Sequence, residues 1–209
     1  NIGVVEQKNV IYIISSPLYK GVDQLKKIYV PFTDIGTNEH IESTLKKYLG
    51  MIGYIICRTS NFKGEDQLRQ MCMTIGYDYK KISGTDENRG MGVYSFIIDR
   101  PSKLTFIHLC GKGRLGQVIG PGKDGKKYIL AIYESTKKPN TDTILQALLG
   151  RMCGYHNNNA IDAYMSESAK DGIEKYNKMW ECIDNQNMED AQEESKYIDR
   201  AMNVKKNRT

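Results

Sequence analysis

The feature that most constrains the fold is a series of short apolar segments separated by helical patterns. Each segment is rich in Ile, Val, Tyr or Phe and is apolar at both odd and even positions, as strands covered on both faces are. The segments predicted as strands are residues 10–15, 28–32, 53–57, 93–98, 104–110 and 128–133.

Helical patterns lie between these segments. Residues 38–51 place apolar side chains four apart, with Asn38 as the predicted N-cap and Glu39 in the first turn, where a negative charge suits the helix dipole. Residues 64–75 form a second predicted helix. The alternation of strand and helix predicts an α/β domain whose mainly parallel sheet is flanked by helices.

The chain changes character after about residue 167, where charged helical sequence replaces the strand pattern. We therefore predict an α/β domain over residues 1–165 and a C-terminal helical extension of two helices over residues 166–209. An apolar stripe marks the extension: Ile173, Tyr176, Trp180 and Ile183.

Composition limits the class of protein. A chain that is 40% hydrophobic and 26% charged is expected to bury an ordinary globular core. The net charge of +5 is distributed unevenly, because residues 100–138 are strongly basic and residues 161–199 are mainly acidic. A phosphate-bearing partner is expected to meet the basic middle of the chain.

The cysteines and the hydropathy exclude further classes. The 5 cysteines are scattered without a CxxC pair, which argues against a disulfide framework or a zinc site and fits a reducing cytosol. There is no signal peptide, and no apolar run approaches the ~20 residues of a membrane span. His108 lies inside an apolar strand and is interpreted as a hydrogen-bonded core residue.

Residues 141–155 (TDTILQALLGRMCGY) carry the most informative pattern. At helical spacing their aliphatic residues share one face, and Gln146, Gly150 and Gly154 lie on the other, with Arg151 at the flank. A glycine inside a helix costs ~1 kcal/mol relative to alanine. That cost is understandable if another backbone, domain or ligand approaches Gly150, and an adjacent arginine could then reach the terminal phosphate of a nucleotide.

These residues resemble motif VI of superfamily 2 helicases, in the form found in phage and large-DNA-virus helicases and in restriction-type translocases. The strand 104–110 and the loop 111–117 (GKGRLGQ) look like motif V of that family. The strand 28–32, with Thr33 and Asp34 at its end, is similar in position to motif IV. The resemblance covers roughly residues 25–165.

The resemblance implies the second RecA-like domain of an ATP-dependent nucleic-acid helicase or translocase. Arg151 would steady the γ-phosphate and Gln146 would order the domain interface, while Gly150, Gly154 and Gly116 would lie next to the nucleotide. ATP and Mg²⁺ would be held mainly by a separate N-terminal RecA-like ATPase domain.

The resemblance also implies contacts with the backbone of DNA or RNA. Lys112, Arg114, Thr33 and Lys123 are the candidate residues, since basic side chains and hydroxyls hold phosphates without reading sequence. The expected location is the cytoplasm, or the host cytoplasm if the protein is viral, with no membrane partner.

The motifs that bind and hydrolyse ATP in such enzymes do not occur in this sequence. No GxxxxGK[ST] is present, and no DExx follows a strand. The nearest imitation, Gly111 to Gly116, is followed by Gln117 where the phosphate-binding lysine would stand. We therefore expect this chain not to hydrolyse ATP alone and to be the second half of a longer protein; its start at Asn1 fits a fragment or a processed product.

Two other functions remain open from the sequence. The first is a non-catalytic RecA-like module that binds nucleic acid or serves as a structural partner. It is favoured because Gly154 occupies the place of the family's second arginine, whereas the glutamine-to-Gly-Arg spacing, one residue longer than usual, is a further departure from the family pattern. The second is a doubly wound small-molecule enzyme such as a methyltransferase, although residues 15–17 (SSP) do not supply its glycine-rich turn.

Overall fold

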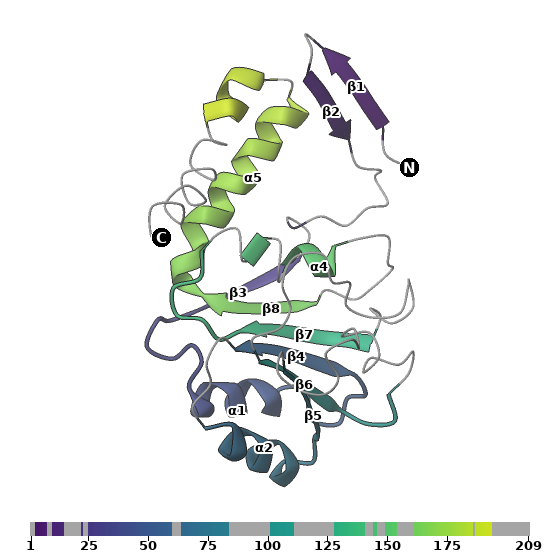
Figure 1. Ribbon diagram of the computed structural model, residues 1–209, viewed down its shortest axis with the longest axis vertical. Coiled ribbons are helices and arrows are strands. Elements are labelled where there is room, and N and C mark those ends of the chain that lie inside the picture. Colours follow the sequence, from purple (N-terminus) through teal and green to yellow (C-terminus); the bar gives the residue numbers. More distant parts are fainter. Residues whose placement is uncertain are drawn as a thin grey trace.

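The protein is an α/β domain built on a six-stranded sheet in which every strand pair is parallel (Figure 1). The computed structural model describes residues 3–7, 10–14, 22, 25–59, 64–83, 101–110, 128–140, 144–145, 149–153, 161–185 and 187–193. The spatial order of the strands is β3 (Lys26–Val30), β8 (Asp162–Ser166), β7 (Ile129–Glu134), β4 (Tyr54–Thr59), β6 (Thr105–Cys110) and β5 (Asp78–Ser83). The fold is consistent with the RecA-like class and confirms the predicted fold class.

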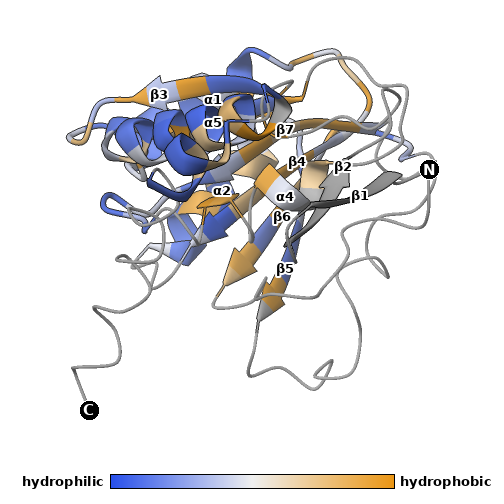
Figure 2. Ribbon diagram, turned by 90° about the horizontal axis from the view of Figure 1, so that it is seen from above, coloured by the Kyte–Doolittle hydropathy of each residue, from blue (hydrophilic) through white to orange (hydrophobic). Residues whose placement is uncertain are grey.

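Helices cover both faces of this sheet. The helices are α1 (Asn38–Lys46), α2 (Glu65–Thr74), α4 (Gly150–Met152) and α5 (Lys170–Asp184), with a 3₁₀ turn η5 (Glu167–Ala169) before α5. In Figure 2, β7 is hydrophobic along most of its length, whereas α1 and α5 are mainly hydrophilic, as expected for helices that bury one narrow face.

The two faces of the sheet have separate hydrophobic cores. On one face, side chains of α1 and α2 such as Ile41 and Leu68 pack with Ile55 of β4 and Phe106 of β6. On the other face, residues 144–145, 149 and 152–153 and the start of α5 pack with the alternate strand side chains, Ile56 and Ile107 among them. This alternation explains why the strands are apolar at both parities.

One predicted strand lies outside the main sheet. Residues 10–15 were expected to belong to the α/β sheet, but β2 (Val10–Ile14) pairs antiparallel with β1 (Gly3–Gln7) in a two-stranded sheet. Only two residues separate β1 from β2, and a link of that length can join antiparallel strands but cannot make the crossover that a parallel pair needs. The predicted strand 93–98 lies outside the described residues.

Two strands of the main sheet escaped the sequence analysis. β5 (DYKKIS) is polar, because it forms an edge of the sheet where Ile82 is buried and Lys80 and Lys81 are partly exposed. β8 (DAYMS) is short, yet it lies between β3 and β7, and its last four residues are buried. Neither strand has the long apolar run by which the other strands were recognised.

The start of α1 differs by one residue from the prediction. Thr37, not Asn38, is the N-cap: its backbone is extended, and its hydroxyl oxygen accepts a hydrogen bond from the backbone N–H of His40 at 3.2 Å. Glu39 lies in the first turn as predicted. The preceding Gly36 has a positive φ of 77°, so the chain turns sharply as it leaves β3.

The described part of the predicted C-terminal extension is mainly helical. α5 is followed by a second helical stretch at residues 188–193. Of the expected apolar stripe, Ile173 is buried, while Trp180 is 38% exposed and makes an edge-on contact with Tyr176. The beginning of α5 is therefore anchored in the core, and its later part keeps an aromatic surface open to solvent.

Candidate functional site

The topology places a switch point between β4 and β7. These two strands are neighbours, but α2, which follows β4, packs on one face of the sheet, whereas residues 144–145, 149 and 152–153, which follow β7, pack on the other. In open parallel sheets, ligands bind outside the carboxyl ends of the strands where the connections diverge in this way. The ends of β4 and β7 are therefore the candidate site.

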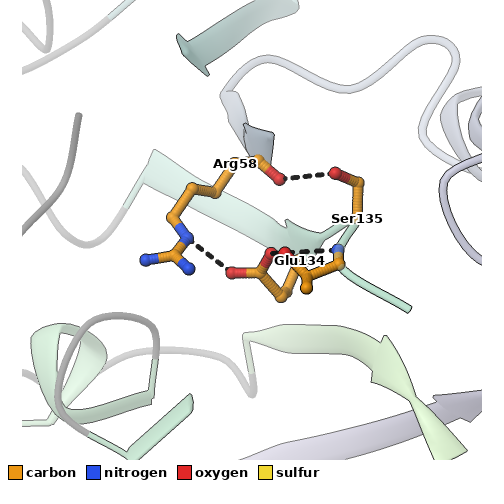
Figure 3. A network of polar contacts seen from close by, with 4 residues as sticks. Arg58, Glu134 and Ser135 are labelled. Carbon is orange, nitrogen blue, oxygen red and sulfur yellow. Dashed lines mark hydrogen bonds and ion pairs between the residues drawn. The ribbon is translucent and has the colours of Figure 1, made fainter. Parts of the chain in front are cut away.

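A buried ion pair spans this switch point (Figure 3). The Nε of Arg58, near the end of β4, lies 2.5 Å from Oε2 of Glu134, the last residue of β7. The Glu134 side chain is fully buried, and that of Arg58 is 18% exposed. The other carboxylate oxygen, Oε1, accepts hydrogen bonds from the backbone N–H and the hydroxyl of Thr136 at 3.0 and 2.5 Å.

Backbone contacts join the same two strand ends. The N–H and the hydroxyl of Ser135 both donate to the carbonyl oxygen of Arg58, at 3.0 and 2.9 Å. Gly36 lies against this point: a Cβ added to it would come within 2.6 Å of the Ser135 carbonyl oxygen, and its N–H donates to the Tyr133 hydroxyl at 3.1 Å. The turn after β3 is therefore packed tightly onto the end of β7.

The same edge carries an exposed aromatic ring. Phe32, in the turn after β3, is 38% exposed, and the ammonium groups of Lys137 and Lys138 lie 5.4 and 5.5 Å from its ring centroid. Its backbone N–H donates to Oε1 of Glu167 at 3.0 Å. The neighbouring Thr33, a predicted nucleic-acid contact, is exposed, and its hydroxyl donates to the Asp34 carboxylate at 2.7 Å.

His108 is buried in the sheet beside β4, as the sequence predicted for a core histidine. Its Nε2 lies 2.7 Å from the Thr59 hydroxyl and its Nδ1 lies 2.7 Å from the Tyr79 hydroxyl. Burial lowers the pKa of His108 to about 4, so its ring is neutral at pH 7. Burial raises the pKa of Tyr79, so that hydroxyl keeps its proton. His108 is thus a structural residue below the site.

The segment with the motif VI resemblance buries its apolar face as predicted. Ile144, Leu145, Leu149 and Met152 have at most 7% exposure and belong to the core on the face of Ile56. The backbone departs from the expected uniform helix, because residues 144–145 and 149 have the wider π-helical geometry and only Gly150–Met152 is α-helical. Such widened turns are frequent at functional sites.

Gly150 is exposed, and its need for a glycine has an internal cause. A Cβ at this position would lie 2.5 Å from the carbonyl oxygen of Leu145. The backbone that approaches Gly150 therefore belongs to its own helical segment, five residues earlier. The sequence analysis expected another backbone, domain or ligand to approach this glycine; the close contact that the structure shows is instead within the same helical segment.

Most of the other predicted site residues cannot be located. Gln146, Gly154, Gly116, Lys112, Arg114 and Lys123 lie outside the described residues, as does the side chain of Arg151. The structure thus positions Thr33, Gly150 and the backbone of Arg151.

The sequence analysis missed the ion pair at the switch point. Arg58 and Glu134 each follow an apolar run near a strand end, and that is the only signal in the sequence. Two further strands intervene between them in chain order. Their proximity follows only from the strand order, which local patterns do not reveal.

The described residues contain neither a metal-binding cluster nor a membrane-spanning helix. No cluster of three or more His, Cys, Asp or Glu side chains among them can hold a metal ion. None of the helices they form is long and apolar enough to cross a membrane.

The fold and the switch-point site define an α/β domain consistent with the RecA-like class. No protein-family model matches the chain. Over 71 residues the chain is 37% identical to an uncharacterised protein, L594, of Acanthamoeba polyphaga mimivirus. The match covers 34% of this chain and 17% of the mimivirus protein, so it relates the chain to a segment of a viral protein.

Proposed function

We propose that this chain is the second RecA-like domain of an ATP-dependent helicase or translocase that acts on DNA or RNA. The observation that carries the proposal is the packing of the motif VI-like segment. Its aliphatic face is buried on the sheet, while Gly150, next to Arg151, is exposed. A domain that supplies an arginine to a nucleotide held elsewhere needs this arrangement, since the surface beside the arginine must be open to its partner.

The partner in this proposal is a Walker-bearing RecA-like domain that holds ATP and Mg²⁺. When the two domains close, the Arg151 guanidinium stabilises the charge that develops on the γ-phosphate, and Gln146 orders the interface. Gly150, Gly154 and Gly116 lie near the nucleotide in the closed state.

The nucleic-acid strand in this proposal runs along the carboxyl edge of the sheet. Thr33 is exposed at this edge, and Lys112, Arg114 and Lys123 belong to the basic part of the chain. The reaction takes place in the cytoplasm, which is the host cytoplasm for a viral protein.

The test is the hydrolysis of ATP by the natural gene product that contains this chain, measured with and without single-stranded DNA and RNA. Arg151→Ala is expected to keep nucleic-acid binding and to lower the stimulated rate at least ~100-fold, the scale of losing one arginine from phosphoryl transfer. Arg69→Ala, which removes an exposed arginine of α2, is the matched control and should leave the rate unchanged.

Two outcomes would overturn the proposal. A stimulated rate in Arg151→Ala equal to that of the unmodified protein would remove the proposed role of Arg151. A natural gene product without a GxxxxGK[ST] and a DExx box that still binds nucleic acid would identify the non-catalytic RecA-like module instead.

A further inference from the structure

Arg58 uses only part of its hydrogen-bonding capacity. An arginine that serves only to neutralise a carboxylate commonly faces it with two parallel N–H groups. Here the contact with Glu134 is made through Nε alone, and Figure 3 shows a single dashed contact between the Arg58 guanidinium and the carboxylate, with one terminal nitrogen pointing away from Glu134. Within the part of the chain that the structure describes, no hydrogen bond or ion pair involves Nη1 or Nη2.

The guanidinium is also held in a fixed orientation. Glu134 is fully buried and is itself fixed by two hydrogen bonds from Thr136. The Arg58 carbonyl accepts two hydrogen bonds from Ser135, so the main chain and the side chain of Arg58 are both anchored to β7. A donor group oriented in advance binds with a smaller loss of conformational freedom.

The outward part of Arg58 lies where the fold places ligands. It is near the carboxyl end of β4, at the switch point with β7, and its side chain is 18% exposed. Lys137 and Lys138 follow the end of β7 and are exposed at the same edge. The Arg58–Glu134 pair carries no net charge, because the carboxylate neutralises the guanidinium. An anion at this site would therefore be held by hydrogen bonds from the guanidinium and by the charges of these two lysines.

We propose that Arg58 is an anion-binding residue whose Nη1 and Nη2 donate a pair of hydrogen bonds to a phosphate group at the switch point. Planar guanidinium groups match phosphate oxygens in this two-donor geometry. The phosphate has two possible sources, a nucleic-acid backbone or a nucleotide. This inference deepens the proposed function, because that function suggests these two sources. The anion site itself is inferred from the geometry of Arg58 and Glu134.

Arg58→Lys is the decisive variant. A lysine keeps the ion pair with Glu134 and therefore the charge balance of the buried pair, but it has no outward pair of donors. Arg69→Lys makes the same change on the exposed surface of α2 and is the matched control. A second variant, Arg58→Leu combined with Glu134→Gln, removes both charges together, so that no buried charge is left unpaired. Urea unfolding verifies that each variant is folded.

Binding is measured with three probes: a fluorescein-labelled single-stranded oligothymidine over a range of salt concentrations, ATP, and inorganic pyrophosphate. If the site holds a backbone phosphate, Arg58→Lys weakens oligonucleotide binding roughly tenfold or more. The slope of log affinity against log salt then falls by about 0.7, the value for one phosphate contact on a single strand. If the site holds a nucleotide, Arg58→Lys weakens ATP and pyrophosphate binding while oligonucleotide affinity is unchanged.

The remaining outcomes separate this inference from the proposed function. Pyrophosphate binding that is lost in Arg58→Lys, in a chain that does not bind the oligonucleotide, would support the anion site and count against the proposed contact with a nucleic-acid strand. Equal binding of all three probes by the unmodified chain and by folded Arg58→Lys would overturn the anion site. Absence of binding of every probe to the unmodified chain would overturn it as well.

Discussion

Lowering the pH should destabilise this protein through His108 in a defined range. Burial lowers the pKa of His108 from 6.5 to about 4 in the folded chain, whereas the unfolded chain keeps the ordinary value. Between these values the unfolded state binds more protons, so the free energy of unfolding falls as the pH falls from about 6.5 to about 4. Above pH 6.5 protonation of His108 does not lower the free energy of unfolding, and below pH 4 the decrease that it causes is complete.

The size of the effect follows from the difference between the two pKa values. One pKa unit corresponds to about 1.4 kcal/mol, so protonation of His108 should cost about 3 kcal/mol in total. Of the charged groups near His108, Glu65 raises its pKa and Lys81 lowers it, and these two residues form an ion pair with each other. Their effects oppose each other, which leaves burial as the dominant cause.

Urea unfolding followed by circular dichroism between pH 4 and pH 7.5 measures this effect. His108→Gln removes the titrating ring and keeps a polar side chain for Thr59 and Tyr79. Between pH 7.5 and pH 4 the free energy of unfolding should therefore decrease less in His108→Gln than in the unmodified chain, by about 3 kcal/mol. His40→Gln is the comparison, because the pKa of half-buried His40 is also lowered by burial. If the free energy of unfolding depended on pH in the same way in the unmodified chain and in His108→Gln, the proposed effect of His108 burial would be refuted.

Two further predictions concern packing. Gly36→Ala should lower the free energy of unfolding by at least ~1–2 kcal/mol, because the backbone at Gly36 is left-handed. The loss should exceed that of Gly50→Ala, because a Cβ at Gly36 meets the Ser135 carbonyl oxygen, while Gly50, at a similar φ, has open space. Equal losses in urea unfolding would refute the close contact. Leu149→Ala should lower the free energy of unfolding by about 2–5 kcal/mol, because it leaves a cavity. Leu49→Ala, at a side chain that is 50% exposed, should change it by less than ~1 kcal/mol. Similar values for the two variants would contradict the burial of Leu149 on the sheet.

The fold was predictable to the extent that each element carries a local signal. Ile41 and Leu45 were expected to share the buried face of α1, and both are 1% exposed. Leu49 continues the same spacing but is half exposed, because the helix ends at Lys46. Periodicity identifies a helical face but not the residue at which the helix stops, which depends on packing further along the chain.

The candidate site was less predictable, because it depends on the order of strands in space. The motif VI-like segment is contiguous, so its buried face could be recognised from spacing alone. Arg58 and Glu134 are 76 positions apart, and they meet only because β7 is inserted beside β4. A buried ion pair between non-consecutive strands leaves no periodic trace, so only tertiary structure reveals it.

The lysine pairs on the two outer strands limit how other chains can join this domain. β3 carries Lys26 and Lys27, and β5 carries Lys80 and Lys81, and charged side chains on an outer strand oppose the addition of another strand. Lys26 is paired with Asp162 and Lys81 with Glu65, so an added strand would also have to accommodate these ion pairs. Lateral growth into larger sheets or fibrils is therefore disfavoured at both borders.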